Sequence, residues 1–146
     1  MYWKPELLGE DVAWLTEHGY RVYHLDCSRW TSAAAALDDL GTTLGFPDYY
    51  GENLDAFNDC LGDVDVPADG GSAIVLMRYD CFAQRERSTA QAILDICASN
   101  ARRFMLFGQR LATLVQSDDP HLSFDTVGST PVMWNRREWL DKNRGL

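Results

Sequence analysis

Three short runs of apolar and β-branched residues stand out along the chain, and each is about as long as a strand in a small domain. The run YRVYHL, around residues 21–25, alternates in part between apolar and polar positions. The run SAIVLMRY, around residues 73–78, is almost continuously apolar, as in a strand buried on both faces of a parallel sheet. The run FMLF occupies residues 104–107. The pattern therefore predicts three strands.

Apolar residues between and beyond these runs recur at the spacing of a helix. Leu37, Leu40 and Leu44 follow one another at intervals of three and four residues. Thr31 or Ser32 can cap the start of that helix. At the end of the chain, Asn135 and Glu138 have the spacing of a capping box. Helices are therefore expected over about residues 11–18, 33–44, 53–62, 88–103 and 135–144.

The order of these elements predicts an α/β fold, in which a small three-stranded parallel sheet has helices packed on it. Helical crossovers between successive strands pair those strands in parallel. The chain has 146 residues, of which 46% are hydrophobic, enough for one packed core. Because no linker marks a second domain, residues 1–146 are expected to form a single domain.

Charge is distributed unevenly along the chain. The formal net charge is −9, yet residues 31–77 contain no lysine or arginine at all. Nine acids fall in that window: Asp38, Asp39, Asp48, Glu52, Asp55, Asp59, Asp63, Asp65 and Asp69. Such a surface would repel the phosphates of a nucleic acid and attract a cationic protein. We therefore expect a basic protein as partner and no nucleic acid.

Several other classes of protein lack support in the sequence. The four cysteines form no C-x-x-C pair and are expected to be buried and reduced. His24 and Cys27, three residues apart on a strand, would project to opposite faces, so neither a metal site nor a cofactor is expected. No apolar run is long enough to span a membrane, and the first residues lack the pattern of a signal peptide. The expected location is the cytoplasm.

The stretch FPDYYGENLDAFNDCL, residues 46–61, carries the candidate site. Glu52 or Asn53 can start a helix on which Leu54, Phe57 and Leu61 share one side. Its other side carries Asp55, Asn58, Asp59 and Gly62. Like charges four residues apart destabilise a helix by a few tenths of a kcal/mol, so stability alone does not explain Asp55 and Asp59.

Three explanations of this helix remain open from the residues alone. The acids could favour the positive end of the helix dipole and otherwise form ordinary solvated surface. Two carboxylates could hold a metal or divide acid and base roles, as in a metal-dependent hydrolase. Alternatively, Tyr49 and Tyr50 could be rigid contacts beside Asp55 and Asp59 in a surface that binds a protein.

The same stretch resembles the signature segment of the barstar family, intracellular inhibitors of a secreted bacterial ribonuclease. The likeness covers about residues 20–108, with an insertion near residues 63–71, and leaves residues 1–19 and 109–146 as terminal extensions. The chain differs at Asn58, where the family carries tryptophan, and at Ser99, which falls about where the third helix of the family contributes a glutamate. The resemblance implies a barstar-like fold.

The resemblance also implies a function without catalysis. An inhibitor of this kind plugs the active site of a basic ribonuclease and acts as an immunity protein or antitoxin. Tyr49, Asn53, Asp55 and Asp59 match family positions that contact the enzyme, and Asp59 matches the acid in the phosphate pocket. The expected binding surface comprises Tyr49, Tyr50, Gly51, Asn53, Asp55, Asn58, Asp59 and Gly62. The alternatives are a module that regulates another basic protein and, more remotely, the hydrolase; the oligomeric state stays open.

Overall fold

The computed structural model of the chain describes residues 1–144, and its centre is a three-stranded sheet. The strands are β1 (Tyr20–Asp26), β2 (Gly71–Met77) and β3 (Leu111–Val115), in the order β1-β2-β3. Both pairings are parallel, with Val75 of β2 opposite His24 of β1 and Leu114 of β3. The central strand β2 is buried on both faces, which explains its nearly continuous apolar sequence.

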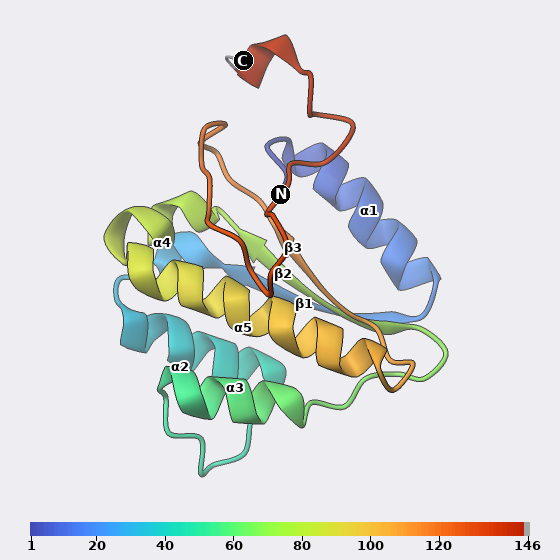
Figure 1. Ribbon diagram of the computed structural model, residues 1–146, viewed down its shortest axis with the longest axis vertical. Helices are drawn as coiled ribbons and strands as arrows, with labels where there is room; N and C mark the ends of the chain where they lie inside the picture. Colours follow the sequence, from blue (N-terminus) through green and yellow to red (C-terminus); the bar gives the residue numbers. More distant parts are fainter. Residues whose placement is uncertain (145–146) are drawn as a thin grey trace.

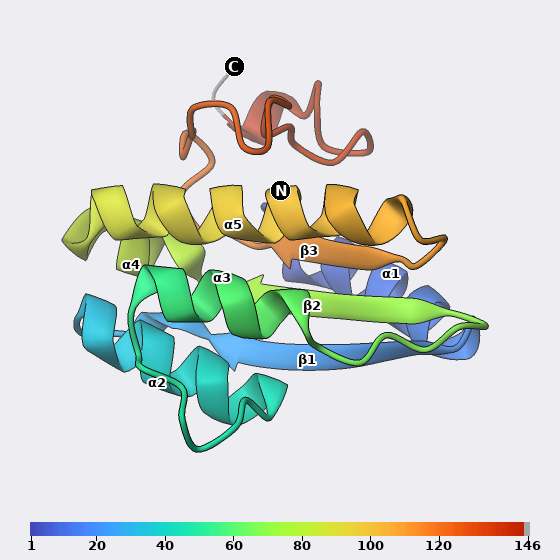
Figure 2. The same ribbon diagram turned by 60° about the horizontal axis from the view of Figure 1, so that its bottom comes forward.

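Helices cover the two faces of the sheet unequally (Figures 1 and 2). The helices are α1 (Pro5–Glu17), α2 (Ala33–Leu44), α3 (Leu54–Gly62), α4 (Tyr79–Arg85) and α5 (Arg87–Met105). Side chains alternate along each strand, so Ile74 and Leu76 join a core with α2, α3, α4 and α5. Ala73 and Val75 face the other way and pack with Leu8 of α1. In Figure 2, α3 lies between α2 and α5.

The α/β fold and its parallel sheet agree with the expectation from the sequence, and so do most of its elements. Ser32 caps α2 by accepting a hydrogen bond from the amide of Ala35 at 3.1 Å, and Gly45 ends it in the left-handed region. The helix α1 starts earlier than expected because Pro5 occupies its first turn, a favoured position for proline. The short helix α4 was not expected.

The third strand was placed wrongly. Phe104 is buried and continues the apolar side of α5, so the helix runs to Met105 and takes up the first half of the predicted strand. Met105, Leu106 and Phe107 are 70%, 80% and 74% exposed. The sheet instead takes up residues 111–115, after Gly108 has turned the chain in the left-handed region.

The expected helix over residues 135–144 is also absent. That segment forms turns and one short 3-10 helix, Lys142–Arg144. Glu138 is fully buried and points away from its own segment: its carboxylate accepts from the backbone amides of Trp3, at 3.0 Å, and Lys4, at 2.6 Å. It thereby satisfies two amides at the start of α1, where Lys4 offers no side-chain cap.

Ion pairs reinforce this junction of the two ends of the chain. Lys4 pairs with Asp141, and Arg137 pairs with both Glu10 and Asp11. We call this set the terminal clasp. It consists of Trp3, Lys4, Glu10, Asp11, Arg137, Glu138 and Asp141. The four cysteines form no disulfide, and all except Cys81 are buried.

Candidate protein-binding surface

The loop before α3 is held in shape by aromatic packing. Phe46 packs against Tyr50, with ring centroids 5.0 Å apart, and against Phe57 of α3. The Tyr50 hydroxyl donates to the carbonyl oxygen of Leu37 at 3.0 Å. A Cβ atom on Gly41 would lie 2.6 Å from the Tyr50 ring, so this glycine makes room for it. Burial raises the pKa of Tyr50 to about 12. Tyr50 therefore fixes the loop on α2 more than it presents a contact.

Tyr49, its neighbour, is 83% exposed, so the two tyrosines of the motif have different positions. The turn after them places Glu52, and not Gly51, in the left-handed region, with φ of 48°. A Cβ on Gly51 would lie 3.1 Å from the side-chain Nδ2 of Asn53. The glycine thus lets the chain pass close to the helix cap, while the strained conformation belongs to Glu52.

Asn53 caps α3 as expected. Its Oδ1 accepts from the amide of Ala56 at 2.9 Å, and its Nδ2 donates to the carbonyl of Gly51. Both bonds are internal to the segment, so Asn53 sets where the helix starts.

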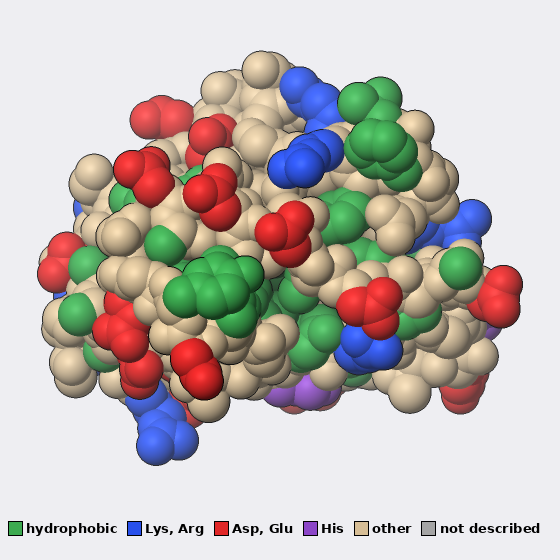
Figure 3. All heavy atoms as spheres, turned by 90° about the horizontal axis from the view of Figure 1, so that it is seen from below, with side chains coloured by type: hydrophobic (Ala, Val, Ile, Leu, Met, Phe, Trp, Pro, Cys, Tyr) green, Lys and Arg blue, Asp and Glu red, His purple; other side chains and the backbone are tan. Residues whose placement is uncertain are grey.

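The two sides of α3 separate apolar from polar residues. Phe57 and Leu61 are fully buried, whereas Asp55, Asn58 and Asp59 are exposed. Within residues 1–144, none of the carboxylates of Glu52, Asp55 and Asp59 takes part in an ion pair. Figure 3 looks at this part of the molecule and shows carboxylates crowding the half that α2 and α3 occupy. The face of α3 is therefore a concentration of carboxylates that form no ion pair within residues 1–144.

One cation approaches α3 from a distant part of the sequence. A Cβ atom on Gly62 would lie 2.8 Å from Nη1 of Arg103, which belongs to α5. The small residue at position 62 allows the guanidinium to lie over the last turn of α3, where the helix dipole favours a positive charge. Sequence reasoning placed no basic residue near this helix, because the pairing of α3 with α5 joins residues forty positions apart.

The chain matches one family of known proteins over most of its length. Residues 20–116 match the family model described as Barstar (barnase inhibitor). The chain belongs to the Barstar family. The match runs to the end of β3, past the limit suggested by the misplaced third strand. α3 and its preceding loop lie inside the Barstar match, whereas α1 and most of the C-terminal segment lie outside it.

One curated relative agrees with the Barstar assignment. Over 60 residues the chain is 68% identical to the protein named "Putative ribonuclease inhibitor YrdF" from Bacillus subtilis (strain 168). That stretch represents 40% of this chain and 62% of the relative. The chain thus spans less than two thirds of the length of the relative that it matches.

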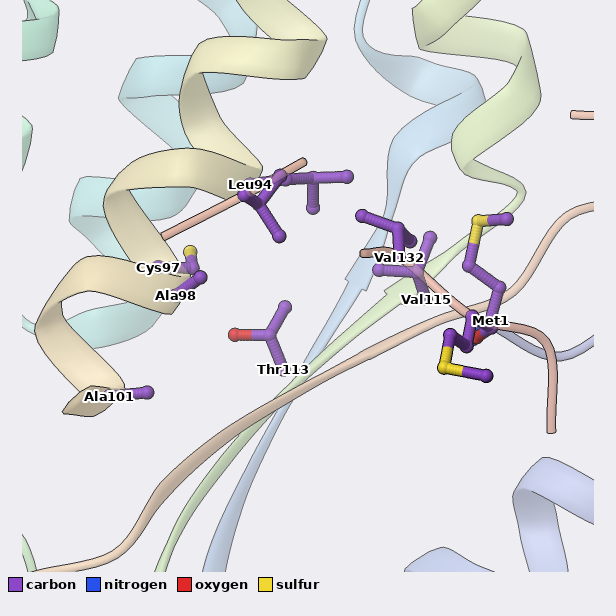
Figure 4. A pocket seen from close by; sticks show the side chains of 10 residues that line it. Met1, Leu94, Cys97, Ala98, Ala101, Thr113, Val115 and Val132 are labelled. Carbon is purple, nitrogen blue, oxygen red and sulfur yellow. The ribbon is translucent and has the colours of Figure 1, made fainter. Parts of the chain in front are cut away.

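The Barstar family is one of inhibitors and not of enzymes. A pocket of about 250 Å³ lies between α5, β3 and residues 127–133 (Figure 4). It is lined by apolar side chains apart from the hydroxyl of Thr113 and the thiol of Cys97, whose pKa burial raises to about 12. The side chains that line it include no group that titrates near neutral pH.

In the part of the chain that the structure describes, no three His, Cys, Asp or Glu side chains are grouped so as to hold a metal ion. Burial also raises the pKa of Cys27, Cys60 and Cys81, which leaves these thiols poor nucleophiles.

None of the helices within residues 1–144 combines the length and apolar character needed to cross a membrane.

Proposed function

We propose that this Barstar-family chain inhibits a basic ribonuclease by inserting the exposed face of α3 into its active site. The observation that carries the proposal is the exposed position of Asp55 and Asp59, four residues apart and without an ion pair inside residues 1–144. A like-charged pair of this kind lowers the stability of the helix, and a cationic surface bound to it would turn the repulsion into attraction.

A ribonuclease supplies that surface. It must present arginine, lysine and histidine side chains to bind phosphate and stabilise the charge of the transition state. A carboxylate ridge is complementary to this site and would also accelerate the encounter of the two proteins. Inhibition then requires no chemical reaction, because occupation of the active site excludes the RNA. Such a protein would protect the cytoplasm of the cell that makes it.

The proposed contacts differ in what they contribute. Asp59 and Asp55 carry the charge, and exposed Tyr49 offers a rigid amphipathic surface at the edge of the patch. Asn58 and Gly62 lie beside α5. Tyr50, Gly51 and Asn53 act through the shape of the loop and the start of the helix.

The test is a binding and inhibition assay with a matched control. Asp59→Ala should weaken the complex by about 2–5 kcal/mol, a range known from interfaces of this family and others, because it leaves a buried positive charge on the enzyme unpaired. Asp69→Ala removes the same charge from the exposed loop before β2 and should change affinity little. Affinity for a panel of basic ribonucleases is measured by calorimetry at low and high salt, together with RNA cleavage.

Three outcomes separate the candidate functions. Equal losses for Asp59→Ala and Asp69→Ala would mean that general charge, and not the α3 face, governs binding. Capture of a basic protein that is not a nuclease, lost in Asp59→Ala, would favour a regulatory interaction module with the same surface. Turnover that depends on added Mg²⁺, Mn²⁺ or Zn²⁺ and on both acids would establish the hydrolase.

A further inference from the structure

The exposed face of α3 is tied to α5 by one hydrogen bond between asparagines. Nδ2 of Asn100, in α5, donates to Oδ1 of Asn58 at 2.9 Å and to the carbonyl oxygen of Ile96 at 3.0 Å. Asn100 is only 2% exposed, whereas Asn58 lies on the surface. A buried amide thus holds an exposed one.

The hydrogen-bonding capacities of Asn100, Asn58 and the Ile96 carbonyl determine the orientation of both side-chain amides. A main-chain carbonyl can only accept, so Asn100 must turn its NH₂ group, and not its oxygen, toward Ile96. The second hydrogen of that NH₂ group is the one available to Asn58. Asn58 must therefore present its oxygen to Asn100, and its own NH₂ group lies at the opposite end of the amide.

The outward NH₂ group of Asn58 donates no hydrogen bond to any other group within residues 1–144. Asn58 lies three residues after Asp55, a spacing at which residues are neighbours on a helix surface, so both side chains belong to the same exposed face. Because Asn100 is buried and locked to its own helix, the amide of Asn58 cannot reverse without breaking this bond.

We infer that the partner places a hydrogen-bond acceptor opposite Asn58, in a surface that is otherwise cationic. The inference rests on the proposed function. A main-chain carbonyl or a carboxylate oxygen of the ribonuclease has the required chemistry. A surface formed only by lysine and arginine side chains offers no such acceptor and would leave both N–H groups of Asn58 without partners, which costs affinity. Asn58 is therefore a specificity residue within a face that otherwise acts by charge.

One substitution separates this inference from charge alone. Asn58→Asp has the same shape and keeps an oxygen to accept from Asn100, but it replaces the outward donors by a second oxygen and adds one negative charge. If charge alone governed binding, Asn58→Asp would bind a cationic partner more tightly. If an acceptor faces position 58, two acceptors oppose each other, and affinity falls at least tenfold.

Thr42→Asp is the matched control. Thr42 is exposed on α2, so this variant adds the same charge away from the α3 face. Its complex should form as tightly as that of the wild type, or slightly more tightly at low salt. Thermal unfolding of both variants establishes that each is folded, and side-chain amide resonances from NMR show whether Asn100 still donates to position 58.

The outcomes distinguish the inference from the proposal beneath it. Weaker binding of Asn58→Asp, with Thr42→Asp unaffected and the Asn100 resonance still protected, supports an acceptor opposite Asn58. Equal or tighter binding of Asn58→Asp overturns the inference and leaves the inhibitor function intact. Failure of the wild-type chain to bind any ribonuclease overturns the proposed function and the inference with it.

Discussion

Two regions of the molecule use carboxylates in opposite ways. In the terminal clasp, Glu138 is buried against two backbone amides and Asp141 pairs with Lys4. On the face of α3, Asp55 and Asp59 are exposed and, within residues 1–144, have no cation as partner. The first set is satisfied by its own chain. The second set remains available to another protein.

The difference separates charges that stabilise the fold from charges that the proposed function assigns to an interaction. Removal of a satisfied buried carboxylate leaves its donors without partners, so stability falls. Removal of one exposed carboxylate from a like-charged pair relieves repulsion, so stability rises slightly. Substitutions in the two regions should therefore change stability with opposite signs, and affinity should respond only at α3.

The largest effect is expected from Glu138→Ala. The amides of Trp3 and Lys4 lose their acceptor at the start of α1, and a cavity replaces a fully buried side chain. We expect a loss of roughly 2–4 kcal/mol in the free energy of unfolding, from two unsatisfied amides at ~1–3 kcal/mol each, partly rehydrated. Urea denaturation measures it, and ribonuclease affinity should stay unchanged.

Glu138→Gln is the control for that substitution. It keeps an oxygen for one amide and loses the charge, so its effect should lie between those of the wild type and Glu138→Ala. A Glu138→Ala variant as stable as the wild type would show that Glu138 of the terminal clasp does not stabilise the fold. The proposed difference between the two regions would then be wrong.

A smaller effect should appear at Asp141 and depend on pH. The hydrogen bond from Lys4 lowers the pKa of Asp141 below its ordinary value of 3.8. A carboxyl group with a lower pKa in the folded state stabilises that state above its unfolded pKa, and this stabilisation is lost as pH falls through the folded pKa. The free energy of unfolding should therefore fall less steeply below pH 4 in Asp141→Asn than in the wild type. Parallel curves would show that the pair with Lys4 contributes nothing in solution.

The smallest effect has the opposite sign. Asp55→Asn keeps the size of the side chain and removes one of two like charges on α3. We expect the free energy of unfolding to rise by a few tenths of a kcal/mol at low salt and to approach the wild-type value in high salt. Asp55 also lies in the first turn, where the helix dipole favours an acid, so a decrease would mean that the dipole outweighs the repulsion.

Local patterns were sufficient for most of the fold. Ser32, Gly45 and Asn53 mark the limits of α2 and α3 through bonds within a few residues, and such bonds can be read from the sequence. The prediction of the third strand failed because Met105, Leu106 and Phe107 are apolar but exposed, and because Phe104 is buried as part of α5. LATLV, which forms β3, contains a threonine and is less apolar than the segment chosen in its place.

The site was predictable only as far as one helix determines it. Asp55, Asn58 and Asp59 are exposed together, as their spacing predicts, but their role in binding stays a prediction. The approach of Arg103 to Gly62 and the bond from Asn100 to Asn58 depend on how α3 packs on α5. Likewise, Glu138 has the spacing of a local cap but serves α1, more than 130 residues away in sequence.

That last contact bears on how the chain folds during synthesis. The Barstar-matched residues 20–116 contain all three strands and the helices α2 to α5, so a ribosome delivers them before the segment that contains Glu138. The start of α1 must wait, without its acceptor, until residues 135–144 emerge. Contacts between residues so distant along the chain form late, because closing a long loop costs conformational entropy before the contacts stabilise it. The exposed face of α3 would thus be complete while α1, on the other side of the sheet, is not yet in its final contacts.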